Sequence, residues 1–368
     1  MNIIFPEQNN NSTTINRNNS QEKLETADTV IKIIGVGGGG TNAINRMQAA
    51  HILGVQLYAV NTDYGSLRQS SADTKISIGT GLGVGGDPKK GEQYALEAVD
   101  KFKDMLDGAN MVFITTGMGG GTGTGAAPVI ARVSKELGIL TVGVVTKPFT
   151  VEGSERIEYA NKGIAKLREY TDAIIVIPND KILMVDGKTP YKKGFEMIDD
   201  VLRRAIESIT DTITKIGEIN IDFADVDSVL RNSDNAIIAL GGGATLEEAF
   251  NEAISNKFVE GEDIRNADKL LVNVSYSNVN EIKVEDTNII FDYIKKHFKK
   301  YISLKVGNIV NNDLDTKLKV SIIAAFKKQE EEANEKDLVD MMRCEEVVEE
   351  EKNPFDRPAY ESYKTTKI

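Results

Sequence analysis

The sequence predicts an α/β fold in which a parallel-sheet domain is joined by a long central helix to a smaller α/β domain. Strand-like β-branched runs alternate with amphipathic helices over the first half of the chain. One unbroken apolar helical pattern follows from Phe195, and four further strand-like runs come after it. At 368 residues the chain is longer than one hydrophobic core usually serves, so two folded domains are expected.

The first domain is expected over residues 29–194, after an Asn/Ser/Thr-rich stretch of residues 1–28 that we expect to be disordered. Its strand-like runs are TVIKIIGV, VQLYAV, MVFITT, ILTVGVVT and AIIVIP. The helices between them are expected to start at Asn42, to span GEQYALEAVDKFKDML, to start at Ala126 and to span SERIEYANKGIAKLREY. Short strands separated by amphipathic helices are typical of βαβ units around a parallel sheet.

The central helix is expected over residues 195–217. Its apolar positions recur at the spacing of one helix face, at Phe195, Ile198, Val201, Leu202, Ala205, Ile206, Ile209, Ile213 and Ile216. Gly217 follows as the expected C-cap. Such a helix spans roughly 30 Å at 1.5 Å per residue.

The second domain is expected over residues 218–326, with the strand-like runs AIIAL, KLLVNVSY, ISLKVG and KVSIIAAF. Helices are expected to begin near Thr245, which forms a capping-box pattern with Glu248, and near Asp286. Residues 327–368 are highly charged and are expected to form a linker and a C-terminal tail.

Composition argues against several classes of function. The formal net charge of −12 disfavours binding to nucleic acid or to an anionic membrane surface. No apolar stretch approaches the ~20 residues that a membrane-spanning helix needs. The single cysteine, Cys344, excludes an internal disulfide and a cysteine-based zinc site. We therefore expect a cytoplasmic protein without direct membrane insertion and without a dedicated metal-ligand cluster.

The first of two glycine-rich segments, GVGGGG (residues 35–40), matches G-x-G-x-x-G between a strand and a helix, and Asp63 follows about twenty residues later. This pattern is typical of dinucleotide binding, so the segment alone leaves a nicotinamide-dependent oxidoreductase or a tight structural turn open. A P-loop is disfavoured because no G-x-x-x-x-G-K-[ST] occurs. The oxidoreductase is also disfavoured, since neither His51 nor His297 lies in a hydride-transfer motif.

The second segment, GMGGGTGTGAAP from Gly117, decides between these alternatives. Consecutive glycine amides can converge on anionic oxygens, and a helix directly after them points its positive end there. Thr122 and Thr124 add hydroxyl donors. Two such loops at the carboxyl ends of parallel strands suit a triphosphate better than a pyrophosphate, whereas a purely structural turn would need fewer glycines.

GGGTGTG (residues 119–125) resembles the signature of the tubulin/FtsZ family. IGVGGGGTNAINRM, VNTD, VGVVTKPFTVEG, VIPND and INIDFADV occur in the order and spacing of its bacterial FtsZ members, and the resemblance runs from about Ile31 to Phe326. It implies a Rossmann-like GTP-binding domain and a C-terminal polymerisation domain. It also implies GTP or GDP with Mg²⁺ as ligands, and a GTPase that assembles with itself head to tail in a mid-cell ring during division.

By the same resemblance, the phosphates are held by the glycine segments at Gly38, Gly39, Gly40, Thr41, Gly121, Thr122 and Gly123. Thr41 stands where the family more often has glycine or serine, which leaves a backbone role intact. Glu152 and Arg156 match ribose- and phosphate-side contacts of the family. Their spacing also fits an ordinary i,i+4 ion pair on a helix surface.

The resemblance assigns contacts with the guanine base of the nucleotide to a third group of residues. Asn42, Asn179 and Asp199 match positions that read the guanine edge. A carboxylate that accepts from N1–H and the 2-amino group would separate guanine from adenine. Phe195 matches the residue that stacks on the base, although a core aromatic on a helix face is the simpler role for it.

The resemblance places hydrolysis in NIDFAD, at Asn220, Asp222 and Asp225. The alternative for the two acids is to be the N-cap and a first-turn residue of the next helix. If Phe195 and Asp199 contact the base, Asn220 follows the far end of a helix roughly 30 Å long. The acids could then reach only the nucleotide of the next subunit in a head-to-tail stack, so hydrolysis would require polymerisation.

FDRPAYES, from Phe355 to Ser362, weakly resembles the family's C-terminal peptide, which docks division proteins and membrane anchors. It lacks the usual basic residue after the aromatic, and six residues follow it, so an ordinary tail is the alternative. A filament protein that binds GTP without hydrolysing it is disfavoured by the intact NIDFAD. A tubulin-like protein serving cell shape or plasmid movement is disfavoured by the residue sequence of the motifs.

Overall fold

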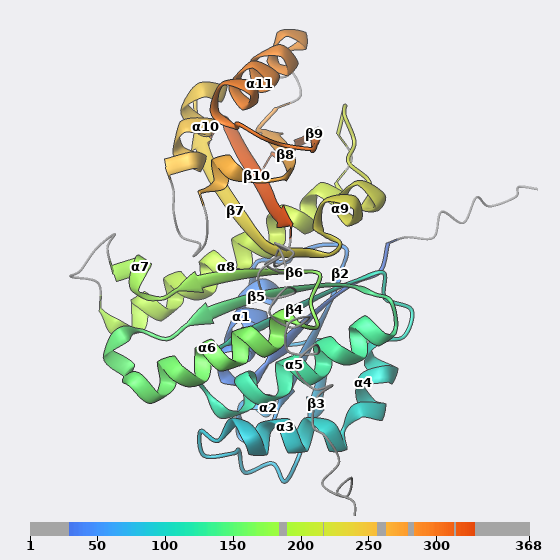
Figure 1. Ribbon diagram of the computed structural model, residues 1–368, viewed down its shortest axis with the longest axis vertical. Helices are drawn as coiled ribbons and strands as arrows, with labels where there is room; N and C mark the ends of the chain where they lie inside the picture. The colour runs from blue at the N-terminus through green and yellow to red at the C-terminus, as the bar shows by residue number, and fades with distance from the viewer. Residues whose placement is uncertain are drawn as a thin grey trace, which may run out of the picture.

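The computed structural model in Figure 1 describes residues 29–183, 190–215, 217–255, 263–278, 283–312 and 314–327. The predicted extension of residues 1–28 lies outside these ranges. So do Cys344 and the tail peptide Phe355–Ser362.

The first six strands run parallel, as the alternating pattern predicts. In their order across the sheet they are β3 (Thr74–Ser77), β2 (Val55–Asn61), β1 (Ile31–Val36), β4 (Met111–Gly117), β5 (Leu140–Lys147) and β6 (Ala173–Pro178). Every residue of β1 is buried. A central strand with both faces covered is a nearly continuous apolar run, and IKIIGV has that character. The short β3 was not predicted.

Helices cover both faces of this sheet (Figure 1). They are α1 (Gly37–Ala49), α2 (Tyr64–Gln69), α3 (Pro88–Glu97), α4 (Val99–Leu106), α5 (Gly121–Glu136), α6 (Ser154–Arg168) and α7 (Asp180–Leu183), with a 3-10 turn η1 (Thr150–Glu152). Ile34 and Val36 belong to one apolar core with Phe102 of α4 and Ile130 of α5, whereas Ile33 belongs to a second core that includes α1. Alternate residues of β1 enter different cores because successive strand side chains lie on opposite faces.

Two predicted helix starts in this domain are wrong, and one predicted helix is divided in two. α1 begins at Gly37 rather than Asn42, and α5 begins at Gly121 rather than Ala126. Glycine disfavours a helix by propensity, but packing of these turns against neighbouring backbone outweighs that cost. The predicted helix GEQYALEAVDKFKDML is two helices, because the N–H of Ala98 bonds back only three residues and ends α3.

The central helix, α8 (Tyr191–Thr214), starts four residues before Phe195 and ends before Gly217. The C-cap is Lys215, in an extended conformation, so the predicted glycine C-cap is wrong. Gly217 serves a close approach instead, since a Cβ there would collide with the carbonyl group of Asn308. The glycine is needed for packing between chain segments and not for ending the helix.

The second domain contains a four-stranded mixed sheet. Across it lie β7 (Ser233–Gly243), β10 (Leu318–Lys327), β8 (Lys269–Tyr276) and β9 (Ser303–Val310). β10 pairs antiparallel with β7 and β8, and β9 pairs parallel with β8. Its helices are α9 (Phe223–Leu230), α10 (Leu246–Ser255) and α11 (Val284–His297), with a 3-10 turn η2 (Ile264–Asn266). Phe250 of α10 stacks on Tyr293 of α11, with ring centroids 4.5 Å apart.

A single residue pair, Ile174 of β6 and Asn235 of β7, joins the two halves into one ten-stranded sheet. Its order is β3-β2-β1-β4-β5-β6-β7-β10-β8-β9. Helix α8 lies along this junction between the two halves (Figure 1). The predicted α/β architecture with a central helix is thus confirmed.

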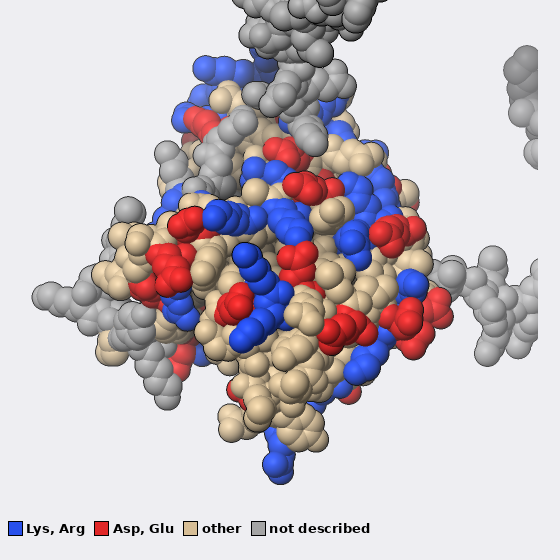
Figure 2. Space-filling model, turned by 60° about the horizontal axis from the view of Figure 1, so that its bottom comes forward, with Lys and Arg blue, Asp and Glu red and all other residues tan. Residues whose placement is uncertain are grey.

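Three further features of the described residues concern membrane-spanning helices, metal-ligand clusters and continuous basic surfaces. Among the described residues, no helix is both long and apolar enough to cross a bilayer, and no cluster of three His, Cys, Asp or Glu side chains could hold a metal ion. Figure 2 views the molecule from the lower side of Figure 1 and shows basic and acidic side chains interspersed over that face. This face therefore presents no continuous basic surface of the kind that binds a phosphate backbone.

Candidate functional site

The two glycine-rich segments lie side by side at the carboxyl ends of neighbouring strands. β1 and β4 pair up to Val36 and Thr116, and the Thr116 hydroxyl donates to the Val36 carbonyl over 2.8 Å. Gly37 has φ +71°, and a Cβ there would lie 3.0 Å from the backbone nitrogen of Gly123. Thr41 is buried, and its hydroxyl donates to the Gly37 carbonyl over 2.8 Å. The two segments, residues 35–40 and 117–125, thus form one continuous backbone surface, which we call the amide surface.

Helices α1 and α5 both start at this surface. Neither of their N-caps, Val36 and Gly120, accepts a hydrogen bond through a side chain from the first amides. A Cβ on Gly38 or on Gly120 would meet no other described heavy atom within 4 Å beyond its chain neighbours. The first amides of a helix need acceptors, and the positive helix end favours an anion. Phosphate oxygens would satisfy both needs.

The other predicted phosphate-contact glycines are packed rather than open. A Cβ would press on neighbouring backbone or threonine atoms at Gly39, Gly40, Gly121 and Gly123. At Gly40 it would lie 2.5 Å from the carbonyl oxygen of Thr115 on β4. At Gly39, Gly40 and Gly123 the closest neighbours belong to β4, and at Gly121 they belong to residues 84–87. These positions lack side chains because other chain segments approach their backbone closely.

A third glycine-rich segment, GTGLGVGGD (residues 79–87), was missed from the sequence. Its five glycines all have positive φ. The Gly83 amide donates to the Thr62 carbonyl over 2.9 Å, and the Thr62 and Thr122 hydroxyls are 2.6 Å apart. A Cβ on Gly121 would lie 2.8 Å from the backbone of this segment. Five glycines in nine residues were the available signal, and they place this segment beside the start of α5.

Glu152 and Arg156 pair beside the second glycine segment. The Glu152 carboxylate accepts from the Phe149 amide over 2.8 Å and from the Arg156 guanidinium. A Cβ on Gly119 would lie 2.7 Å from the Arg156 carbonyl oxygen, so the base of α6 abuts the loop. The glutamate side chain is 12% exposed and the arginine 54% exposed. The i,i+4 pair of the simpler interpretation is therefore present, and it lies next to the predicted phosphate surface.

Among the residues predicted to contact the guanine base, Asn179 has a buried side-chain acceptor that a ligand donor would satisfy. It directly follows β6, it is buried, and its backbone amide donates to the Lys147 carbonyl over 3.1 Å. Its side-chain oxygen has no hydrogen-bond partner among the described residues. A buried acceptor left without a donor costs about 1–3 kcal/mol, which a ligand N–H would offset. Phe195 is half-buried with its ring edge-on to Phe149, and Asn42 is exposed on α1.

Asp199, on the same helix as Phe195, is held in an unusual electrostatic environment. Its side chain is 15% exposed, and it accepts a 3.4 Å hydrogen bond from the Arg46 guanidinium. Burial raises the pKa of Asp199 to about 6, and the attraction of Arg46 opposes that rise. Glu196 raises the pKa further and also lies 3.8 Å from Arg46. A ligand that donates hydrogen bonds to the carboxylate would favour its ionised form.

The predicted hydrolytic residues form a separate group after α8, and we call Asp222 and Asp225 the acid group. Asp222 is the N-cap of α9 and accepts from the Asp225 amide over 2.9 Å, while Asp225 accepts from the Asp222 amide over 3.4 Å. The Asn220 side chain accepts from the Gly217 amide over 2.7 Å. The ammonium of Lys305 lies 2.7 Å from the Asp225 carboxylate. The capping role of the simpler interpretation is therefore real, and it leaves Asn220 and Asp222 exposed.

One subunit does not bring the two groups together. Asp199 is the ninth residue of α8, and Asp222 follows the end of that helix. Helices α7 and α9 lie at opposite ends of α8 (Figure 1). From Asp199 to Thr214 the axis alone rises about 22 Å.

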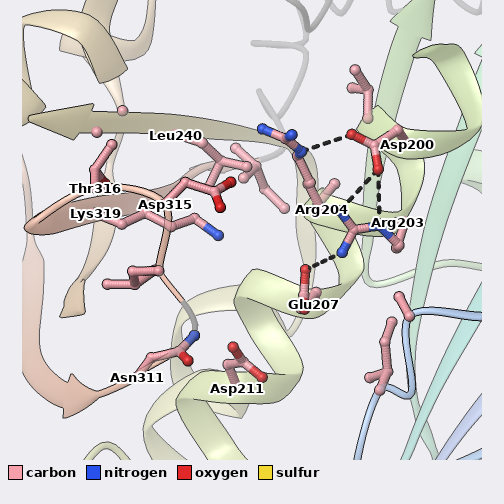
Figure 3. A pocket seen from close by; sticks show the side chains of 18 of the residues that line it. Asp200, Arg203, Arg204, Glu207, Asp211, Leu240, Asn311, Asp315, Thr316 and Lys319 are labelled. Carbon is pink, nitrogen blue, oxygen red and sulfur yellow. Dashed lines mark hydrogen bonds and ion pairs between the residues drawn. The ribbon is translucent and has the colours of Figure 1, made fainter. Parts of the chain in front are cut away.

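A large cleft of about 1210 Å³ lies elsewhere, between α8 and the second domain (Figure 3). Asp200 accepts from Arg203 and Arg204 over 2.8 Å each, and Glu207 accepts from Arg203 over 2.6 Å. Lys319 of β10 points toward α8, and burial lowers its pKa against the attraction of Glu207. No residue of the glycine segments lines this cleft.

An open parallel sheet with two adjoining amide-lined loops at its carboxyl edge defines a nucleotide-binding α/β protein. Residues 30–186 match the model of the Tubulin/FtsZ family GTPase domain, and residues 235–326 match that of the FtsZ family C-terminal domain. The chain belongs to the tubulin/FtsZ family. It is therefore a GTPase, which confirms the expected guanine nucleotide and decides against an oxidoreductase.

Similar proteins support this assignment over most of the chain. The cell division protein FtsZ of Pseudomonas aeruginosa is 41% identical over 303 residues, which are 80% of this chain and 76% of that protein. Its Pseudomonas putida counterpart is 42% identical over the same shares. The structure of an M. jannaschii FtsZ dimer matches with a TM-score of 0.76 at 36% identity, covering 82% and 89% of the two chains. CetZ2 from Haloferax volcanii matches in fold, with a TM-score of 0.68 at 20% identity over 88% of this chain and 100% of that one.

Proposed function

We propose that this protein polymerises head to tail in cell division and hydrolyses GTP at the contact between successive subunits. The proposal is supported by a separation along α8. Arg46, on the helix that the first glycine segment opens, contacts Asp199 of α8, whereas the acids follow the other end of α8. A contact that joins two different poles of a chain does not close on itself and produces filaments. Each junction then completes one hydrolysis site, and a lone subunit has none.

Each predicted residue takes a role that fits its surroundings. The open amides near Gly38 and Gly120 bind the phosphates, and Mg²⁺ accompanies the triphosphate rather than a protein ligand cluster. Asn179 and Asp199 accept hydrogen bonds from the guanine edge. Asp222 and Asp225 polarise the attacking water, with Asn220 orienting it.

The relatives named as cell division proteins support a cellular setting in division. We place the filament in the cytoplasm, in a ring at mid-cell. Division proteins and membrane anchors would dock on the C-terminal peptide Phe355–Ser362. Deleting residues 355–368 would remove partner binding and leave GTPase activity intact.

A mixing experiment tests the shared site. Asp225→Asn removes a hydrolytic charge but leaves the amide surface, whereas Gly38→Leu fills the open space above the amides but leaves the acids. In equal mixture, about a quarter of the junctions would pair an intact amide surface with an intact acid group. We expect phosphate release to exceed that of either variant alone.

Sedimentation with GTP and with GDP controls for assembly. Mixed filaments that release no phosphate at any ratio would contradict the shared site. Phosphate release per molecule that stays constant on dilution far below the assembly threshold would do the same, since a lone subunit would then be active.

A further inference from the structure

A cation lies within the acid group, contributed by a distant strand. The Lys305 ammonium on β9 is 2.7 Å from the Asp225 carboxylate, and the two side chains are 38% and 27% exposed. Asp225, and to a smaller extent Asp222, raise the pKa of Lys305. The lysine therefore stays charged at neutral pH while remaining accessible to solvent.

The same strand fixes the segment that carries the acids. The Asn308 side-chain oxygen accepts from the Glu218 and Ile219 amides over 3.0 Å each, and the Asn308 amide donates to the Ile219 carbonyl over 3.0 Å. Asn308 is buried, and a Cβ on Gly307 would lie 2.6 Å from the Ile221 side chain. Strand β9 and the segment that carries the acids thus belong to one packed unit, which would arrive at a neighbouring subunit together.

The positive charge of Lys305 would offset the repulsion between the acid group and a triphosphate. Two carboxylates brought to a triphosphate meet like charge, which opposes both assembly and reaction. Transferring phosphoryl groups are commonly stabilised by lysine or arginine supplied to the site. The ammonium of Lys305 reduces the charge of the acid group from −2 to −1 at the place where it would meet the phosphates.

We propose that Lys305 is a further residue of the hydrolysis site, a cation that Asp225 carries to the neighbouring subunit's γ-phosphate. There it stabilises the charge that develops as the water oxygen bonds to the γ-phosphorus and the bond to the β,γ-bridging oxygen breaks. GDP and dihydrogen phosphate leave, with the water oxygen and both of its protons on the product phosphate. This inference rests on the proposed function.

The test compares Lys305→Met and Lys305→Arg with Lys296→Met, which removes the same charge from α11 outside the acid group. The readout is GTP turnover per sedimented subunit at saturating GTP, together with the melting temperature. We expect Lys305→Met to lose roughly 100- to 1000-fold in turnover, by analogy with removing one transition-state donor. Lys305→Arg should keep most of the activity and Lys296→Met all of it. A purely structural lysine would change the melting temperature or the amount of polymer, but not turnover per polymerised subunit.

A mixture shows where the lysine acts. Lys305→Met subunits have an intact amide surface, and Gly38→Leu subunits have an intact lysine. Recovered turnover in their mixed filaments would support action on the neighbour, and no recovery in filaments that contain both would overturn it.

Should Lys305→Met fail to assemble, Lys305→Cys in a Cys344→Ser background provides a second route. Alkylation with 2-bromoethylamine restores an ammonium at position 305, and turnover should return with it. Filaments of the alkylated protein that stay inactive would overturn the inference. If Lys305→Met keeps full turnover while Asp225→Asn loses it, the lysine proposal fails alone. If both variants keep full turnover, the shared hydrolysis site fails as well.

Discussion

The guanidinium of Arg46 on α1 donates a 3.4 Å hydrogen bond to the carboxylate of Asp199 on α8, 153 residues further along the chain. The first glycine segment opens the helix that carries Arg46, so this contact ties the amide surface to the proposed base site. It also leaves a carboxylate that is largely buried and only partly neutralised. Such a group responds to a ligand that donates hydrogen bonds.

Guanine nucleotide affinity should therefore depend on pH. Burial raises the pKa of Asp199 to about 6, above its ordinary 3.8, so the folded protein holds a proton that the unfolded chain releases between these values. Folding stability from this group is accordingly lost as pH rises through that window. Nucleotide binding has the opposite sign, because guanine donors need the ionised carboxylate. We expect GTP affinity to fall about tenfold per pH unit below 6 and to level off above 7, in a fluorescence titration.

Asp199→Asn is the matched control, because it keeps the shape and removes the titration. We expect the pH dependence to flatten and the preference to shift from GTP toward xanthosine triphosphate, whose 2-oxygen accepts from an amide. A GTP preference that stays unchanged in this variant would count against contact between Asp199 and the base.

Asn179→Ala should separate nucleotide binding from stability. The buried side-chain oxygen has no partner among the described residues, so its removal costs the free protein little. In the complex the same oxygen would accept a guanine N–H, and its loss should weaken GTP binding by about 1–2 kcal/mol, or roughly 5- to 30-fold. Calorimetric titration and thermal unfolding measure the two effects. A large drop in melting temperature with unchanged affinity would assign the residue a structural role only.

Two glycines of the first segment should respond differently to the same change. Gly38→Ala adds a methyl group to open space in a helical turn, and should leave stability unchanged or raise it by up to about 1 kcal/mol. Gly40→Ala places its Cβ 2.5 Å from the Thr115 carbonyl oxygen and should destabilise the fold by about 1–3 kcal/mol. Denaturant unfolding without nucleotide compares them. Gly38→Ala should instead weaken GTP binding, and equal stability losses for both would contradict the described packing.

These contrasts show which features the sequence alone could predict. The parallel strands and the central helix follow from β-branched runs and a long apolar period, which are local signals. Helix starts at Gly37 and Gly121 do not, because glycine propensity points the other way and only contacts with β4 and residues 79–87 stabilise those turns. The contact between Lys305 and Asp225 could not be predicted from the sequence either, because 80 residues separate the two and no motif joins them. The roles of the base contacts came from family resemblance, not from spacing.

Two substitutions at Asp222 separate the charge of its side chain from its capping role. Its carboxylate accepts from the Asp225 amide at the start of α9, so Asp222→Ala should cost about 1 kcal/mol of folding stability. Asp222→Asn keeps an acceptor of equal reach, and asparagine caps helices about as well as aspartate. If the carboxylate polarises the attacking water, both variants should lose GTP turnover while only alanine lowers the melting temperature. Turnover per sedimented subunit that follows the melting temperature instead, falling with alanine and surviving with asparagine, would leave Asp222 as a helix cap alone.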